Sequence, residues 1–167
     1  MKRTVLTVLV VTVLSAISAV IVRIVLLDGD SWRASLKLST ALKGARAVTL
    51  VEYVPNAILA RKTATADEIA RLRNAANVWL CPFDPTYYLS CEPHHRLEIV
   101  RADGSEVAVL IAFGCKQFGF TDDEKVVVIP PSLTKSLASF FASVGMAPKT
   151  SGEYDAIVAR QIEEVAR

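Results

Sequence analysis

The stretch RLEIVRADGSEVAVLIAF, residues 96–113, predicts a β-hairpin. Two segments rich in branched apolar residues, 96–101 and 106–113, flank the sequence Ala-Asp-Gly-Ser. Gly104 supplies the left-handed backbone conformation that a tight connection between two strands needs. The hairpin is therefore the starting point for the fold.

The register of this hairpin follows from its alternation. A three-residue loop with a glycine bulge makes apolar residues face each other, whereas a two-residue loop would set Val109 against Glu98. We therefore expect the bulged register, with one buried face. Its pairs are Leu97 with Val109, Ile99 with Val107 and His95 with Ile111.

Other segments complete an α+β domain. The residue patterns of 46–54 and 125–129 predict two further strands. Residues 116–120 are expected either to prolong or to bend the second strand of the hairpin. The sheet should therefore be antiparallel, with about four strands and helices packed on one face. Residues 80–92 predict an irregular loop.

Three helices are indicated. Thr65 and Glu68 form a capping box before a helix at 66–79, which includes Trp79. Pro130-Pro131 begins a second helix that Gly145 ends, and residues 153–167 predict a third. The second helix has one apolar stripe, formed by Leu133, Leu137, Phe140, Phe141 and Val144.

The composition of the first 27 residues predicts a membrane-spanning segment. Residues 4–22 carry no charge, Arg23 interrupts the run, and residues 24–27 are again apolar. A helix that crosses the hydrocarbon core needs about 20 such residues. We therefore expect an uncleaved signal-anchor that contacts the membrane through residues 4–27.

The charges beside this segment predict its orientation. Lys2 and Arg3 precede it, and Asp28 and Asp30 follow it, so the N-terminus should be cytoplasmic and the domain extracytoplasmic. A secreted form remains the alternative, because Ala16-Ile17-Ser18 offers a small-residue cleavage site. The sequence leaves this choice open.

The remaining chain divides into three parts. Residues 28–44 form a juxtamembrane segment in which Ser39 caps one short turn, 45–150 form the α+β domain, and 151–167 form a C-terminal amphipathic helix. Of the 19 Lys+Arg, three lie in the first 27 residues, whereas all 17 Asp+Glu lie beyond them. The domain is thus nearly neutral, which argues against a nucleic-acid partner.

Cys91, His95 and Cys115 form the one group of side chains in the sequence that could bind a metal or take part in a reaction. The hairpin register sets Cys91 opposite Cys115, so a cross-strand disulfide is expected in an oxidising compartment, with Cys81 free. Reduced buried cysteines are an alternative. A metal site, with zinc as the cofactor, is another, although His94 and His95 should point to opposite faces of an extended strand.

The chain combines four features: Cys91-Glu-Pro-His-His95, the Asp-Gly hairpin, Phe113-Gly-Cys115 and the helix that begins with Pro-Pro. Through these features it resembles a group of small uncharacterised bacterial proteins that are exported or membrane-anchored. Those proteins pair a Cys-x-Pro-x-His segment with a later Cys-Phe-x-Cys segment. This chain has Ala112 in place of the first cysteine of the later segment. The resemblance implies an exported location and this fold, and it implies no activity.

The function expected from these features is a membrane-anchored, extracytoplasmic domain that is non-catalytic and acts through a protein or envelope partner. No catalytic or cofactor-binding residue is assigned, since the sequence contains no nucleophile elbow, phosphate loop or His-Glu-x-x-His pair. The alternative is a metal- or thiol-dependent enzyme centred on Cys91, His95 and Cys115. Oligomeric state, partner and ligand are not encoded in any recognisable pattern.

Overall fold

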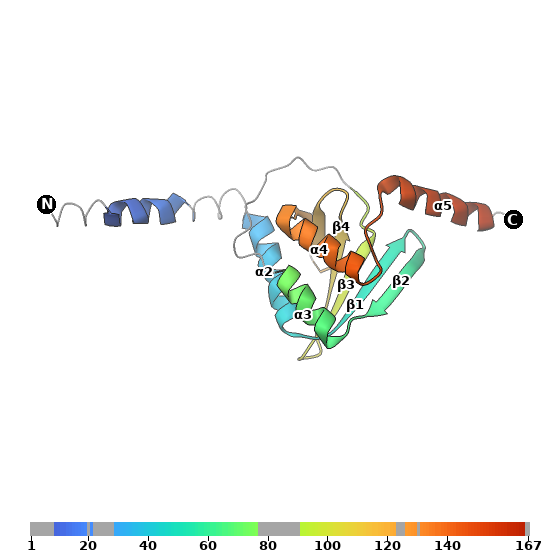
Figure 1. Ribbon diagram of the computed structural model, residues 1–167, viewed down its shortest axis with the longest axis horizontal. Coiled ribbons are helices and arrows are strands. Elements are labelled where there is room, and N and C mark those ends of the chain that lie inside the picture. Colours follow the sequence, from blue (N-terminus) through green and yellow to red (C-terminus); the bar gives the residue numbers. More distant parts are fainter. Residues whose placement is uncertain are drawn as a thin grey trace.

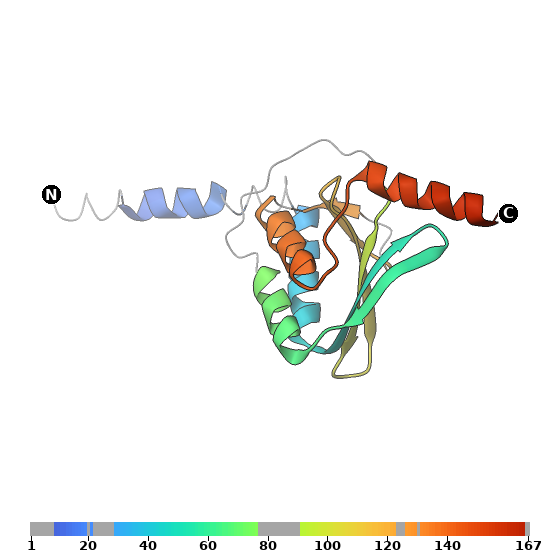
Figure 2. The same ribbon diagram turned by 45° about the vertical axis from the view of Figure 1, so that its right-hand side comes forward.

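The fold is α+β, as the sequence predicts. The computed structural model describes residues 9–19, 21, 29–76, 91–122, 126–129 and 131–165. A six-stranded antiparallel sheet has the order β2-β1-β3-β4-β5-β6. Helices α2, α3 and α4 cover one face of it, and α5 lies at one end (Figures 1 and 2). The expected count of about four strands is therefore wrong.

The elements follow one another in the order α2, β1, β2, α3, β3, β4, β5, β6, α4 and α5. Their bounds are α2 Gly29–Lys43, β1 Ala45–Val54, β2 Ala57–Thr63, α3 Ala66–Ala75, β3 His95–Arg101, β4 Glu106–Ala112, β5 Gln117–Phe120, β6 Val126–Val128, α4 Pro131–Ser143 and α5 Ser151–Val165.

The β3–β4 hairpin has the predicted register. Leu97 pairs with Val109, Ile99 with Val107 and His95 with Ile111. Gly104 has φ +82°, and the turn is closed by Asp103, whose carboxylate accepts hydrogen bonds from the Ser105 amide and hydroxyl. The odd-numbered side chains face the helices and are buried, so alternation and turn chemistry were sufficient to predict this element.

Two strands differ from the prediction. After Pro55, Asn56 adopts φ +68° and reverses the chain into β2, which the sequence analysis missed. Residues 117–120 neither prolong nor bend β4 but form the separate strand β5, because Lys116 at φ +52° completes a second reversal. In both places a non-glycine residue has the left-handed conformation: Asn56 in the first turn, and in the second Lys116 rather than the neighbouring Gly114.

Helix α2 corrects the description of residues 28–44 as a juxtamembrane stretch with one short turn. It has 15 residues and contributes Leu38, Ala41 and Leu42 to the core, all with no exposed surface. The spacing of these three residues places them on one face of a helix. The core of the domain therefore begins before residue 45.

The other helices agree with the prediction in their essentials. Thr65 and Glu68 form the expected capping box of α3, and Gly145 at φ +83° follows α4. Helix α3 ends at Ala75, however, before the expected end at residue 79. The Met146 amide donates to the Phe141 carbonyl, which closes the end of α4. Helix α5 begins at Ser151, the first residue of the expected C-terminal helical segment 151–167, and two residues before the helical spacing that starts at 153. Residues 77–79 with Trp79, the loop at 80–90 with Cys81, and residues 166–167 lie outside the described residues.

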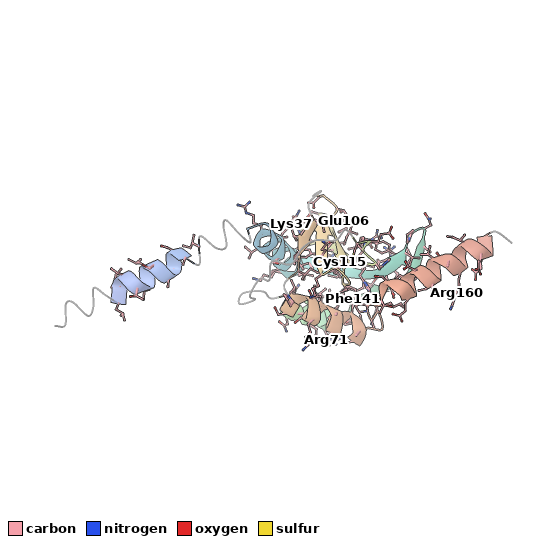
Figure 3. The ribbon with its side chains drawn as sticks, turned by 90° about the horizontal axis from the view of Figure 1, so that it is seen from above. Lys37, Arg71, Glu106, Cys115, Phe141 and Arg160 are labelled. Carbon is pink, nitrogen blue, oxygen red and sulfur yellow. A yellow bond between two sulfur atoms is a disulfide. The ribbon has the colours of Figure 1, made fainter. Side chains whose placement is uncertain are left out.

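The core lies between the sheet and helices α2, α3 and α4. Leu133, Leu137, Phe140 and Phe141 of α4 are buried against the sheet, as their stripe predicts. Figure 3 shows the labelled Arg160 on the part of α5 that extends away from Phe141. The beginning of α5, in contrast, is fixed to the domain by Tyr154, which is 3% exposed.

The N-terminal membrane segment was predicted over residues 4–27. Residues 9–19 are helical with exposed side chains, and the rest of that segment, apart from residue 21, lies outside the described residues. Within the part of the chain that the structure describes, we find no helix of the length and apolarity that a membrane crossing requires. The signal-anchor stays a prediction.

Candidate functional site

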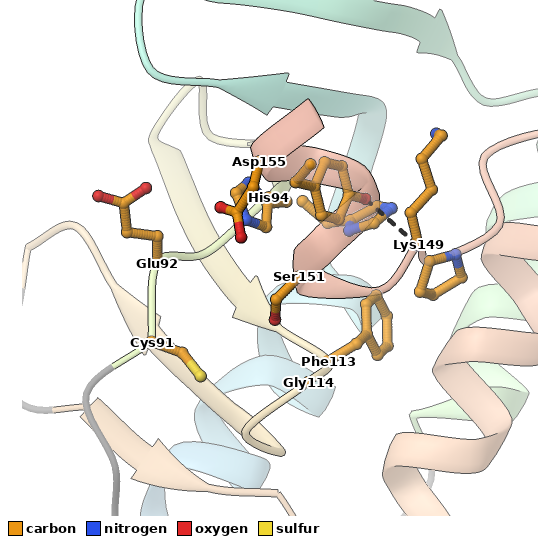
Figure 4. A pocket seen from close by; sticks show the side chains of 11 residues that line it. Cys91, Glu92, His94, Phe113, Gly114, Lys149, Ser151 and Asp155 are labelled. Carbon is orange, nitrogen blue, oxygen red and sulfur yellow. Dashed lines mark hydrogen bonds between the residues drawn. The ribbon is translucent and has the colours of Figure 1, made fainter. Parts of the chain in front are cut away.

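A cavity of about 280 Å³ opens where β1 ends, β3 begins, β4 ends and α5 begins (Figure 4). Polar and aromatic side chains from the start of β3, the turn after β4 and the start of α5 meet there, because the sheet brings residues far apart in sequence to one end. The lining residues are Cys91, Glu92, His94, His95, Phe113, Gly114, Pro148, Lys149, Ser151, Tyr154 and Asp155.

A buried carboxylate lies behind this cavity. Glu52 occupies an inward-facing position of β1, after Val48 and Leu50, and is 3% exposed. The Lys149 ammonium forms an ion pair with it, and the Tyr154 hydroxyl donates a hydrogen bond to Glu52 Oε1 at 3.2 Å. A carboxylate in the protein interior needs a cation and hydrogen-bond donors beside it, because removing an unpaired charge from water costs several kcal/mol.

Tyr154 joins α5 to this carboxylate. Its hydroxyl also accepts a hydrogen bond from the Lys149 amide at 3.5 Å, so the oxygen has a partner on each side. Burial raises the pKa of the Tyr154 hydroxyl, which therefore stays protonated and can keep donating to Glu52. The start of α5 is fixed by this contact and by a capping box of Thr150 and Glu153.

His95 is the most deeply buried lining residue, at 1% exposed. Its Nε2 donates a hydrogen bond to the Met146 carbonyl at 3.2 Å, and the rings of Phe113 and Phe141 lie edge-on at 5.0 and 4.9 Å. Burial lowers the pKa of His95 to about 4, while the nearby Glu52 carboxylate opposes that shift. The imidazole is therefore neutral near pH 7 and links β3 to the end of α4.

His94 contacts the same cavity, although alternation predicts that it points away from His95. It precedes the first residue of β3 and follows Pro93, so the regular side-chain alternation of the strand does not extend to it. Its Nδ1 donates to the Tyr53 carbonyl at 3.2 Å, and its ring stacks on Tyr154 with centroids 3.8 Å apart. Both imidazoles thus line one cavity.

Cys91 and Cys115 form the predicted disulfide, with Cα atoms 6.1 Å apart, but it is not a cross-strand bond, because β3 begins at His95 and β4 ends at Ala112. The bond connects the segment before β3 to the turn after β4, and Cys91 lines the cavity. The alternative of a zinc site at Cys91, His95 and Cys115 does not match this geometry, because both sulfurs are bonded to each other. Among the described residues, no three His, Cys, Asp or Glu side chains are placed to hold a metal ion.

Glu52, Lys149, Tyr154 and Asp155 were not identified from the sequence. Glu52 carried a usable signal, because it is a charged residue at an inward position of an otherwise apolar strand. Lys149 and Tyr154 carried none, since they are joined to Glu52 only by the tertiary fold. Comparison of the chain with protein-family models, curated proteins and solved structures finds no match.

Proposed function

We propose that this protein is a membrane-anchored, extracytoplasmic domain that acts by binding a protein partner of the cell envelope, and that it is not a catalyst. The observation that carries the location is the disulfide between Cys91 and Cys115. Such bonds form and persist in oxidising compartments and are rare in the cytosol. The uncharged run at residues 4–22, with Lys2 and Arg3 before it, supports an anchor with a cytoplasmic N-terminus.

Binding is favoured over catalysis because the polar groups in the cavity and behind it are already engaged in interactions within the protein. Glu52 is used in an ion pair with Lys149. His95 is neutral and donates to a backbone carbonyl. The two cysteines are bonded to each other and so offer no thiolate. These groups give the cavity a fixed shape, which favours recognition of a partner.

The location is tested on the full chain in a bacterial host. We expect the protein to stay with membranes through alkaline carbonate washing, and an external protease to cleave it after Leu27 in spheroplasts. A variant that lacks residues 2–27 serves as the control, and it should stay inside the cell with Cys91 and Cys115 reduced. A soluble exported form that begins near Ala19 would contradict the anchor and support cleavage. Full protection from the external protease would contradict an extracytoplasmic domain.

A further inference from the structure

The cavity beside the disulfide has more hydrogen-bond acceptors than donors. Glu92 and Asp155 line it, both are exposed, and neither carboxylate has a partner within the described residues. The His94 Nδ1–H donates a hydrogen bond to the Tyr53 backbone carbonyl, which leaves Nε2 of the same ring as the atom that can accept one. Three acceptors near the opening are thus unused.

A fourth acceptor lies deeper, and it is an independent observation. His95 is 1% exposed, yet only its Nε2 has a hydrogen-bond partner among the described residues. Since that nitrogen donates to a carbonyl, Nδ1 carries a lone pair with no donor facing it. Because His95 lines the cavity, a ligand that donates a hydrogen bond can use this lone pair.

The charges point to a cationic ligand. The one cation of the lining, Lys149, is paired with Glu52 behind the cavity, so these two charges cancel locally. Glu92 and Asp155 remain, which leaves two negative charges at the opening. An anionic ligand would be repelled by both carboxylates and would find the Lys149 ammonium already engaged.

The remaining walls are suited to an aliphatic chain. The Phe113 ring, the Pro148 ring and the sulfur of Cys91 are apolar surfaces in the same cavity. A volume of about 280 Å³ can hold a single long side chain. A ligand with an apolar stem and a positively charged, donor-rich end matches both the walls and the acceptors.

We propose that this cavity receives a lysine or arginine side chain of the partner protein. The aliphatic stem lies along Phe113 and Pro148, and the charged end donates hydrogen bonds to the acceptors of Glu92, Asp155 and the two imidazoles. This inference rests on the proposed function for the identity of the partner as an envelope protein. The recognition itself is independent of where the protein resides.

The test uses the full chain in uncharged detergent micelles with EDTA present, so that metal ions do not contribute. The probes are the N-acetyl methylamides of lysine, arginine and norleucine, the last of which has the same stem as lysine without the charge. We expect lysine or arginine to bind at least tenfold more tightly than norleucine in NMR titrations. Tenfold corresponds to about 1.4 kcal/mol, the range of two favourable surface ion pairs.

Matched variants identify the residues responsible. Glu92→Gln with Asp155→Asn removes the two carboxylates, and Asp67→Asn with Glu163→Gln removes the same charge from exposed positions elsewhere. The first pair should reduce the preference for the cationic probes to less than twofold, and the second should preserve it. Equal binding of norleucine, or equal losses in both pairs, would overturn the proposal. If the probes show no preference for a positive charge but the protein is membrane-anchored and exported, this site is wrong and the proposed location still holds. If the probes bind as expected but the protein is not exported, the site holds and the proposed location is wrong.

Discussion

Glu52 is a buried charged residue that depends on two partners, Lys149 and Tyr154. It is almost fully buried, and Lys149 supplies the only charge that balances it within the described residues. The Tyr154 hydroxyl adds one hydrogen bond but no charge. Removal of the ammonium would therefore leave a buried carboxylate that is uncompensated.

Lys149→Met should destabilise the protein by about 1–3 kcal/mol, which is less than for a fully buried pair because the Lys149 side chain is 35% exposed. Urea denaturation measures this change in the free energy of unfolding. Lys135→Met, at an exposed position of α4, is the control and should cost less than about 0.5 kcal/mol. Adding Glu52→Gln to Lys149→Met should recover most of the loss, and no recovery would contradict the role given to the ion pair.

His95 should make stability depend on pH. Its pKa is about 4 in the folded protein and near its ordinary value of 6.5 when unfolded, so the unfolded chain binds the proton more strongly. Stability should therefore fall as the pH is lowered from about 6.5 to 4, by up to about 3 kcal/mol in total. Urea midpoints at several pH values measure this loss.

A His95→Gln variant provides the control for this pH dependence, because its amide can still donate to the Met146 carbonyl but does not titrate. The variant should lose most of the slope between pH 6.5 and 4. The carboxylates of Glu68, Asp103, Asp122 and Glu153 have lowered pKa values, so their contributions are lost at more acidic pH. An unchanged slope in the variant would show that another group is responsible.

At the scale of elements, α4 should carry much of the core energy. Phe140 is 5% exposed and packs beside Phe141. Phe140→Ala should cost about 3–5 kcal/mol, through lost burial and the cavity left behind. Thermal and urea denaturation measure the loss, and Ser139→Ala on the exposed side of the same helix should change stability by less than about 0.5 kcal/mol. A cost below about 1 kcal/mol for Phe140→Ala would contradict its place in the core.

The elements that could be predicted are those specified by neighbouring residues. The β3–β4 hairpin, the capping box of α3 and the glycine after α4 all have local signals, and all are present. Strand β2 was missed because it is an edge strand with mostly half-exposed residues, so its alternation is weak. Helix α2 was missed because its buried face is narrow and polar residues separate the apolar ones.

In the candidate site, too, only the part that neighbouring residues specify could be predicted from the sequence. The pairing of Cys91 with Cys115 was predictable because both cysteines flank one hairpin whose register has a local signal, although both lie beyond the paired strand residues. The contacts of Glu52 with Lys149 and Tyr154 span about a hundred residues of sequence, and no local pattern encodes them. They could be found only after the sheet order and the position of α5 were known.

At the scale of the whole molecule, the disulfide should contribute measurably to stability. Replacing both Cys91 and Cys115 by serine should cost about 2–3 kcal/mol, because the bond restricts the unfolded chain, and the β3–β4 hairpin already provides part of that restriction. Urea denaturation of the oxidised protein and of the double variant measures the difference. Peptide mapping without reduction should recover the Cys91–Cys115 peptide, and a linkage that includes Cys81 would contradict the pairing.

The strand order has a consequence for the rate of folding. Strands β3 to β6 form a meander in which each pair is close in sequence, and β1 and β2 form a second local hairpin. The pairing of β1 with β3 joins the two units and must close the loop between Val54 and His95, so its entropic cost should set the slow step. The disulfide joins the two sides of the β3–β4 hairpin, which is already formed when the two units pair. Oxidation raises the free energy of the unfolded chain and should therefore speed folding more than it slows unfolding.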